Sequence, residues 1–545
     1  MNSVPGAAPS PQINPAALLP PDWDLAHDVL LIVGEGASAI AAPFVQYGLE
    51  RVITMFPRPL QPEDTPEGAS MACSRGDLSR IVNLYGEQHP RRYATIRTPR
   101  CSLDIATTNE IQSMLAQLVQ RKNANQQSQD HLAPLWATNG LKNLPHVAKS
   151  PMVDDMRDAF RGVPIIIVGA GPSLAKNIDQ LKAAQGKAII LCVNRALRSL
   201  QNAGVWPDFA INLEPQDVAS QFVGIDLSRI PGLVLSVTSH PELFELEAPR
   251  ILSFASNLDA EGWMFDSTDE VTEIVTGGSV SCSALSLGLM WGCDPIMLVG
   301  QDLSFPGGSY YHADGVDGAT EAIFDEETKT WTLEGLSDDL SKLLKGRSEE
   351  FGLRFEGTEV PGYFGGTVPT STDFAVFREW FEYTALDHKD QVSLLNCTEG
   401  GAFIKGMDHI PLSVALRDLP ERPVNPADLL HTDRLDHLLA PRQARMMHRL
   451  ETIQNGLRTA ITQAEDCIVL IDRFTGGRDD MVRLQQAESV LQETLRTVKV
   501  LSLMDQAGIR QATAQGQAAT SLAESLAASR TLYQFIVDDG RRLLV

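Results

Sequence analysis

The sequence has no apolar run long enough to cross a bilayer, and it is poor in positive charge. No stretch reaches the roughly 18 consecutive apolar residues of a membrane helix, and the first twenty or so residues lack the basic start and apolar core of a signal peptide. The chain has 45 Lys and Arg residues and 69 Asp and Glu residues, which gives a formal net charge of −24. This balance excludes a general electrostatic footprint for nucleic acid or anionic lipid, so we expect a cytoplasmic protein that binds neither.

Cysteine is scarce and scattered. The chain has 7 cysteines, an odd number, and no two of them form a Cys-x-x-Cys pair. Disulfide frameworks and zinc knuckles both depend on paired cysteine spacings, so neither is predicted. We assign no residue as a metal ligand from the cysteine pattern, and we expect no tightly bound cofactor. Whether the protein needs a metal stays open.

The pattern of apolar, polar and turn residues along the sequence divides the 545 residues into three regions. Residues 1–125 form a small N-terminal α/β domain whose first 20 or so residues, rich in Pro and Ala, are expected to be disordered. Residues 126–420 form a central α/β domain. Residues 421–545 repeat apolar side chains at helical spacing, which predicts a bundle of three or more helices whose apolar stripe is core.

The most informative stretch is residues 163–213. Four apolar residues, Ile165 to Val168, lead into Gly169-Ala-Gly-Pro-Ser173 and then into helical spacing, which predicts a strand, a tight turn and a helix. Further strands over 188–193 and 209–213 are followed by polar residues. Because open parallel sheets bind ligands at the carboxyl ends of their strands, we expect a binding site at this edge.

The alternation of strands and helices continues to a strand over 295–299 and predicts a Rossmann-like, doubly wound parallel sheet. Short helices are expected over 128–160, and the segment 306–372 is expected to be one long functional loop with a helix near 337–345. Residues 27–55 echo the central pattern, with Gly34-Glu-Gly36 after a strand, and predict a second Rossmann-like unit. Gly-x-Gly turns also occur between a strand and a helix without any ligand. We prefer this interpretation for residues 34–36.

The turn after Val168 is a candidate phosphate site. Gly169 and Gly171 allow close backbone approach, Pro172 suits a first helical position, and exposed N–H groups at a helix start favour an anion. Ser173 either donates to that anion or caps the helix. The turn is neither Gly-x-Gly-x-x-Gly nor a Walker loop, so a dinucleotide or P-loop ATPase is not supported.

Polar residues at other strand ends complete the candidate site. Asn194 either contacts a nucleoside or caps the following helix, and Asn212 and Glu214 either hold a ribose or a metal or are plain loop residues. Asp302 either acts on substrate or caps a turn. His312, flanked by Tyr310 and Tyr311, is either a general base assisted by phenols or a structural histidine.

These motifs together resemble the central domain of the motility accessory factor (Maf) family. The resemblance covers about residues 130–410 and is carried by six short motifs: Gly169-Ala-Gly-Pro-Ser-Leu174, Asn194-Arg-Ala-Leu197, Gly204-Val-Trp-Pro-Asp-Phe209, Thr276-Gly-Gly-Ser-Val280, Gly300-Gln-Asp-Leu-Ser304 and Glu399-Gly-Gly-Ala402. One departure is Glu214, where related domains commonly have Asp.

The resemblance implies a glycosyltransferase that moves a nonulosonic acid, such as pseudaminic or legionaminic acid, from its CMP-activated donor to Ser or Thr of flagellin, with a role in flagellum assembly and motility. On this hypothesis we expect the donor to be held by Gly169, Gly171, Pro172, Ser173, Asn194, Asn212, Glu214, Thr276, Gly278, Ser279 and Gln301. His312 is expected to be the base, with Tyr310, Tyr311 and Asp302 also in the catalytic set.

Two alternatives remain at this stage. The same domain type occurs in hydroxymethylpterin diphosphokinases, which implies an enzyme using Mg²⁺·ATP with the ion on carboxylates such as Glu214 and Asp302. The other is a non-catalytic flagellin-binding or export factor whose helical bundle grips its partner.

Overall fold

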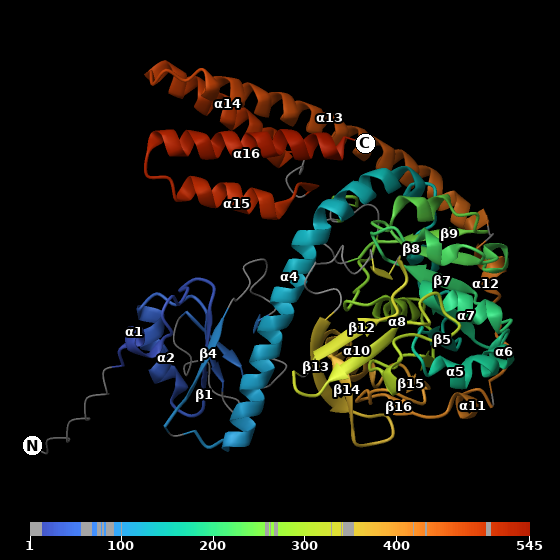
Figure 1. Ribbon diagram of the computed structural model, residues 1–545. Coiled ribbons are helices and arrows are strands. Elements are labelled where there is room, and N and C mark those ends of the chain that lie inside the picture. Colours follow the sequence, from blue (N-terminus) through green and yellow to red (C-terminus); the bar gives the residue numbers. More distant parts are fainter. Residues whose placement is uncertain are drawn as a thin grey trace, which may run out of the picture. The chain divides into compact units, whose positions relative to one another are not determined.

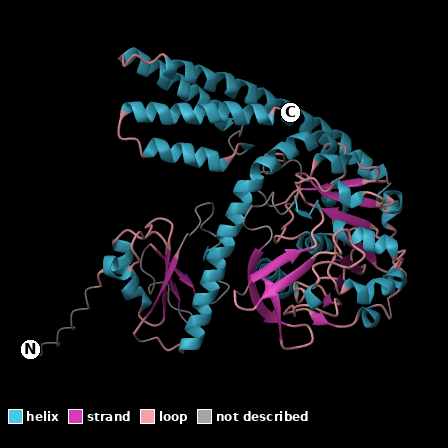
Figure 2. Cartoon of the chain, in the orientation of Figure 1, coloured by secondary structure: helices cyan, strands magenta, loops and turns pink. Residues whose placement is uncertain are grey.

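The computed structural model describes residues 13–55, 68–72, 78, 81–82, 92–99, 101–256, 261, 263–265, 271–328, 330–338, 340–341, 354–417, 419–430, 433–497 and 503–544. The chain divides into two compact units, Met1–Gln129 and Asp130–Val545. The elements of both are labelled in Figure 1, and Figure 2 separates helices from strands by colour.

The first unit is built on a four-stranded sheet whose pairings are all parallel, in the order β3-β2-β1-β4. Its elements are α1 (Pro15–Leu18), β1 (Val29–Val33), α2 (Ala37–Gln46), β2 (Val52–Met55), β3 (Ala69–Ala72) and β4 (Tyr93–Arg97). The parallel pairing agrees with the predicted α/β unit. Gly34 and Gly36 both have positive φ, and a Cβ on Gly34 would lie 2.6 Å from Thr98 Oγ1. The chain itself therefore fills one side of this turn.

Two expectations for the N-terminal half need correction. Residues 15–18 form the short helix α1 rather than part of a disordered tail, while residues 1–12 lie outside the described part. The apolar spacing over 106–127 predicts a helix that ends in a polar, glutamine-rich run, but the helix continues as α4 (Ile105–Val147), so residues 128–147 are not separate short helices. Pro134 and Pro145 lie inside α4 without ending it.

The second unit contains an eight-stranded parallel sheet in the order β16-β15-β10-β5-β6-β7-β8-β9. Its strands are β5 (Ile165–Val168), β6 (Ile189–Val193), β7 (Phe209–Asn212), β8 (Gly232–Ser236), β9 (Ile251–Phe254), β10 (Ile296–Val299), β15 (Leu394–Asn396) and β16 (Asp408–His409). This is the parallel sheet that the alternating pattern predicts, extended by the short strand β16.

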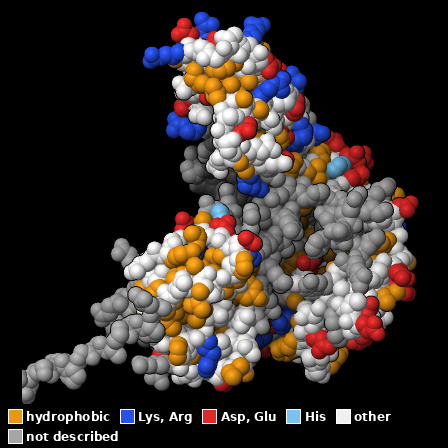
Figure 3. Space-filling model, turned by 60° about the vertical axis from the view of Figure 1, so that its left-hand side comes forward, with side chains coloured by type: hydrophobic (Ala, Val, Ile, Leu, Met, Phe, Trp, Pro, Cys, Tyr) orange, Lys and Arg blue, Asp and Glu red, His pale blue; other side chains and the backbone are white. Residues whose placement is uncertain are grey.

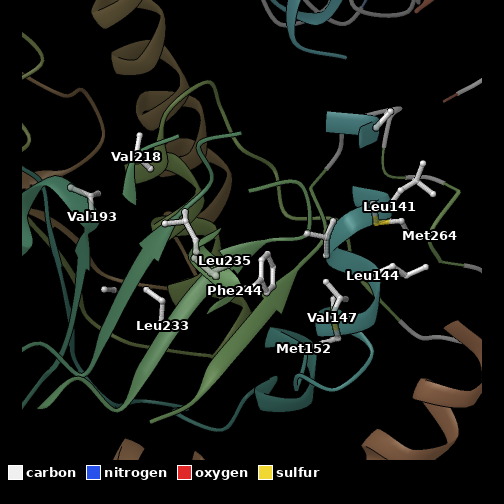
Figure 4. Packing of buried hydrophobic residues seen from close by; sticks show 14 of the residues in the cluster. Leu141, Leu144, Val147, Met152, Val193, Val218, Leu233, Leu235, Phe244 and Met264 are labelled. Atoms are coloured by element: carbon white, nitrogen blue, oxygen red, sulfur yellow. The ribbon is translucent and has the colours of Figure 1, made fainter. Parts of the chain in front are cut away.

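Helices cover both faces of this sheet, and alternate side chains of each strand supply the two cores. Ile166 and Val168 of β5 face one core, and Ile165 and Ile167 face the other. The helices are α5 (Leu174–Asn177), α6 (Leu181–Ala184) and α7 (Leu197–Asn202) with the first core, and α8 (Val280–Met290) and α10 (Thr372–His388) with the second. Figure 4 shows Leu141, Leu144 and Val147 of α4 packing in the first core near Phe244.

The segment 306–372 is not one long loop. It contains an antiparallel sheet in the order β11-β12-β13-β14, formed by β11 (Glu321–Asp325), β12 (Thr330–Glu334), β13 (Arg354–Pro361) and β14 (Thr367–Ser371). Phe305 and Trp331 form its small core against Phe374 of α10. Its strands are short and rich in polar and turn residues, so periodicity did not reveal them. Residues 338, 340 and 341 are helical, and the rest of the helix expected to 345 lies outside the described residues.

The C-terminal region is a bundle of α13 (Asp433–Asp472), α14 (Arg478–Thr497), α15 (Gln506–Gln517) and α16 (Leu522–Leu543), preceded by α11 (Leu412–Ala415) and α12 (Pro426–Leu430). The apolar spacing over 509–537 predicts one further helical run, and the structure has two helices there, because Ser521 caps α16 by accepting the Glu524 N–H at 3.2 Å. The predicted stripe, including Met446, Leu457 and Ala464, is buried in a core continuous with that of the sheet. These residues are therefore core, as expected.

The outer surface of the bundle carries some apolar side chains. Val469, Val490 and Leu522 are 43%, 54% and 53% exposed, and Figure 3 shows apolar patches among Lys and Arg side chains on this part of the molecule. No helix in the described part of the chain combines the length and apolarity needed to cross a membrane.

Candidate active site

The candidate site lies at the carboxyl edge of the large sheet, where the order of the strands reverses. From β5 the chain continues to β6, β7, β8 and β9 on one side, and then returns to β10 on the other side of β5. Open α/β sheets bind their ligands at such a reversal. The loops that follow β5 and β10, residues 169–173 and 300–304, therefore occupy the expected position.

These two loops pack backbone against backbone. The Gly171 N–H donates to Gly300 O at 2.9 Å. A Cβ on Gly169 would lie 2.5 Å from Gly300 O, and one on Gly171 would lie 2.7 Å from the same oxygen. The glycines that the sequence analysis assigned to a phosphate are thus also required by the contact between the loops.

Asp302 binds the loop after β5 through hydrogen bonds. Its carboxylate accepts the Ser173 N–H at 3.1 Å and the Ser173 hydroxyl, and its side chain is buried. Burial raises the pKa of Asp302 to about 6, although the hydrogen bonds from Ser173 act in the opposite direction. Ser173 makes no side-chain cap, and the helix after it, α5, has only four residues. The long helix expected here is absent, which weakens the predicted dipole contribution to an anion site.

A third loop, residues 397–401, joins this arrangement. The Lys176 ammonium donates to Glu399 O at 2.6 Å, Asn177 donates to the Glu399 carboxylate at 2.8 Å, and the Gln301 N–H donates to Thr398 Oγ1 at 3.2 Å. Glu399 has a φ of 57°, an unusual value for a residue with a side chain. The turn after β5 is therefore held on two sides by loops from β10 and β15.

His312 lies directly beside the same turn. Its backbone N–H donates to Ala170 O at 2.9 Å, and its ring Nδ1 accepts the Asp314 N–H at 3.2 Å. Burial lowers the pKa of His312, while the Asp314 carboxylate acts to raise it, and the net direction is downward. The ring is accordingly neutral at neutral pH. Since Nδ1 accepts a hydrogen bond, the proton of the neutral ring is on Nε2.

This tautomer bears on the role expected for His312. A general base would have to accept a proton at an unprotonated nitrogen, and here Nδ1 is occupied and Nε2 carries the proton. In this tautomer Nε2 is the nitrogen that can donate a hydrogen bond. Geometry thus favours His312 as a hydrogen-bond donor over the general base that the sequence suggested.

Tyr310 and Tyr311 sit against a buried arginine. The Arg195 guanidinium lies 4.9 Å from the ring centre of Tyr311 and forms an ion pair with Asp317. Desolvation acts to lower the pKa of Arg195, but Tyr311, Asp317, Tyr310 and Glu214 together raise it. The Tyr310 ring stacks on Phe305 with 5.3 Å between centroids. Tyr310, Tyr311 and Arg195 therefore form one packed cluster, and its two tyrosines are next to His312 in the chain.

The remaining strand-end residues form hydrogen bonds within the protein. Asn194 does not cap a helix: its amide donates to Gln221 at 2.5 Å. Asn212 accepts the Glu214 N–H at 2.8 Å, and its own amide nitrogen is buried without a hydrogen-bond partner among the described residues. An orphaned buried donor at a strand end is unusual and suits a ligand oxygen.

Residues 276–279 form the start of α8, the eleven-residue helix that packs beneath β5 and β6. Ser279 caps it by accepting the Cys282 N–H at 3.3 Å. A Cβ on Gly278 would lie 2.7 Å from the Phe377 ring of α10. Thr276, Gly278 and Ser279 are thus tied to the second core.

The structure does not bring Glu214 and Asp302 together as a metal site. They follow β7 and β10, which are separated by β6 and β5. Three strand spacings of about 4.8 Å put those strands about 14 Å apart. Asp302 is also engaged by Ser173. The shared Mg²⁺ expected for the diphosphokinase alternative therefore stays a prediction.

Three residues of the edge were missed from sequence. Arg195 and Asp317 form a buried ion pair whose partners are 122 positions apart, and Asp317 also accepts the Ser337 hydroxyl at 2.5 Å. Glu261 is buried after β9 and accepts from the Thr238 hydroxyl at 2.8 Å and from the Ser256 N–H. Arg195 belongs to the motif Asn194-Arg-Ala-Leu197. Its place in that motif is the signal that could have identified it from the sequence.

Comparison with known proteins agrees with this architecture. Residues 138–308 match the family model described as 6-hydroxymethylpterin diphosphokinase MptE-like. The match includes β5 to β10 and the loops at their carboxyl ends, and stops before Tyr310. An uncharacterized protein of Treponema pallidum (strain Nichols) is 31% identical over 126 residues, which are 22% of this chain and 57% of that protein. The match thus spans little more than half of that relative.

A solved structure resembles almost the whole chain. The structure of MAf glycosyltransferase from Magnetospirillum magneticum AMB-1 superposes with a TM-score of 0.51, covering 95% of this chain and 78% of that one, at 16% sequence identity. At this identity the likeness establishes the fold. The resemblance to Maf proteins and to the MptE-like domain, predicted from short motifs, is confirmed at that level.

Proposed function

We propose that this protein is a glycosyltransferase that transfers a nonulosonic acid from a CMP-activated donor to Ser or Thr hydroxyls of flagellin. The observation that carries the proposal is the fold shared over 95% of the chain with a structure titled as a MAf glycosyltransferase. The short motifs of the central domain, whose loops meet at the reversal of strand order, support it.

In the proposed reaction an acceptor hydroxyl oxygen attacks the anomeric carbon of the sugar, the bond from that carbon to the phosphate oxygen breaks, CMP leaves, and the hydroxyl proton passes to the departing phosphate or to water. The enzyme must hold the phosphate, bring the hydroxyl into line and stabilise the charge that develops on the leaving phosphate. We place the phosphate beside Ala170 to Pro172, which are partly exposed, and the nucleoside near Asn212.

His312 is the residue we assign to the leaving group. Its main chain is bonded to Ala170 of the β5 loop, and Asp314 holds the neutral ring in the tautomer that donates from Nε2. A neutral donor beside the phosphate stabilises CMP as it departs. Asp302 and Ser173 act indirectly. Their hydrogen bonds hold the loop to which the main chain of His312 is bonded.

Substitution of His312 separates donation from base catalysis. Gln can donate a hydrogen bond but cannot accept a proton at neutral pH. We expect His312→Ala to lower transfer by about 100-fold or more and His312→Gln to keep a measurable part of it. Equal loss in both variants would favour a base, and full activity in His312→Ala would remove this residue from the mechanism.

The second candidate function, a diphosphokinase, rests on the MptE-like match over residues 138–308. Calorimetry with the full chain distinguishes the two. Binding of CMP without added metal supports the glycosyltransferase, whereas binding of Mg²⁺·ATP with no affinity for CMP supports the diphosphokinase.

A further inference from the structure

Three metal-ligating side chains converge at the ends of β7 and β8, apart from the residues assigned above. Asp217 lies five residues after β7, and His240 and Glu242 follow β8. One ligand atom from each lies within 4.8 Å of the other two. Two ligand atoms that each lie about 2.0–2.2 Å from one ion can be at most about 4.4 Å apart, so a small movement of these side chains is enough for them to share an ion.

The backbone holds these ligands in place. The His240 N–H donates to Glu214 O at 3.0 Å, which joins the loop after β8 to the loop after β7. The Asp217 carboxylate accepts the Ala219 N–H at 3.0 Å, which orients the carboxylate and leaves its other oxygen for a ligand. Neither contact depends on a long flexible side chain, so the convergence is a property of the two loops.

His240 also carries a ring nitrogen that no group in the described part of the chain satisfies. Nδ1 of His240 is inaccessible to solvent and has no hydrogen-bond partner among the described residues. Buried polar atoms of this kind are rare and call for an explanation such as an ion. In addition, no described lysine or arginine forms an ion pair with Asp217 or Glu242, so two neighbouring carboxylates lack a protein counter-charge.

We propose that Asp217, His240 and Glu242 bind one divalent transition-metal ion, Mn²⁺ or Zn²⁺. The two carboxylates balance the charge of the ion. The imidazole nitrogen favours these metals over Mg²⁺ and Ca²⁺, which prefer all-oxygen sites. Asp217 and Glu242 are exposed, so further coordination positions face solvent and can take water. The site does not depend on the proposed glycosyltransferase activity.

Metal binding to the untagged full chain tests this inference. Mn²⁺ titration followed by electron paramagnetic resonance of the free ion should give one saturable site per chain. Asp217→Asn, His240→Gln and Glu242→Gln should each weaken that site by at least 10-fold. Zn²⁺ should displace the bound Mn²⁺, and Mg²⁺ in equal amount should not.

A neighbouring pair supplies the control. His146 and Glu245 also form a histidine–carboxylate contact, with 3.2 Å between Nε2 and Oε1, but no third ligand joins them among the residues that the structure describes. The double variant His146→Gln, Glu245→Gln should leave Mn²⁺ affinity unchanged. Circular dichroism shows whether each variant is folded, and the two variants at the exposed carboxylates decide the result even if His240→Gln does not fold. Absence of a stoichiometric site, or an affinity that the three single variants leave unchanged, would overturn the proposal.

Discussion

Asp302, after β10, accepts two hydrogen bonds from Ser173, after β5, one from the backbone N–H at 3.1 Å and one from the hydroxyl. The contact joins the two loops at the point where the strand order of the sheet reverses. It assigns Asp302 a positioning role: the carboxylate shapes the turn that we place against the phosphate.

Removing this carboxylate should destabilise the protein. Asp302→Ala leaves the Ser173 donors without partners in a buried place, so we expect a loss of about 1–3 kcal/mol in the free energy of unfolding. Denaturant unfolding measures it. Asp314→Asn is the control, because the Asp314 side chain is exposed and the change should stay within about 0.5 kcal/mol. A loss no larger than that of the control would show that the contact does not matter.

The ion pair between Arg195 and Asp317 should have a larger effect. Both side chains are mostly buried, so Asp317→Ala leaves a desolvated guanidinium without its partner, at an expected cost of about 3–5 kcal/mol. The exposed pair of Arg530 and Asp472 is the comparison, and Asp472→Ala should cost about 0–1 kcal/mol. Similar losses in the two variants, measured by chemical denaturation, would contradict the burial argument.

Glu261 should make stability depend on pH. Burial raises the pKa of Glu261 from 4.5 to about 7, although hydrogen bonds from Ser256, Thr238 and Ser236 act to lower it. The folded protein therefore binds this proton more tightly than the unfolded chain. The resulting stability is complete below about pH 4.5 and is lost as pH rises through 7, by at most about 1.4 kcal/mol per pH unit.

Glu261→Gln removes this titration. The variant should show a flatter loss of unfolding free energy between pH 5 and pH 8 than the wild type does. Asp302, whose pKa is about 6, contributes a slope of the same sign in both proteins, so the comparison isolates Glu261. Identical pH profiles would mean that Glu261 does not titrate in this range.

The sequence was most informative where periodicity is strong. Apolar runs such as Ile165–Val168 and Ile296–Val299 are fully buried strands in the structure, and the stripe through Met446 and Leu457 is helix core. The antiparallel sheet over 321–371 was missed because its strands are short and polar. The length of α4 was missed because the polar, glutamine-rich run within it has the composition of a linker.

The candidate site residues were selected one by one from the sequence, but the contacts between them depend on the tertiary fold. Nothing in the spacing of Ser173 and Asp302, 129 positions apart, indicates that one accepts hydrogen bonds from the other. The protonated nitrogen of His312 likewise follows from the Asp314 N–H, a contact that becomes visible only when the loop is folded. The ligand roles expected for Asn194, Thr276, Gly278, Ser279 and Gln301 stay predictions.

The intact mass of flagellin, after incubation with this protein and a CMP-activated nonulosonic acid, tests the central claim most directly. The account predicts that flagellin gains mass in whole multiples of the sugar residue, that CMP appears in equal amount, and that His312→Ala lowers both by about 100-fold or more. A flagellin that is bound but keeps its mass with every nonulosonate donor supplied would contradict it and would favour a non-catalytic binding or export factor.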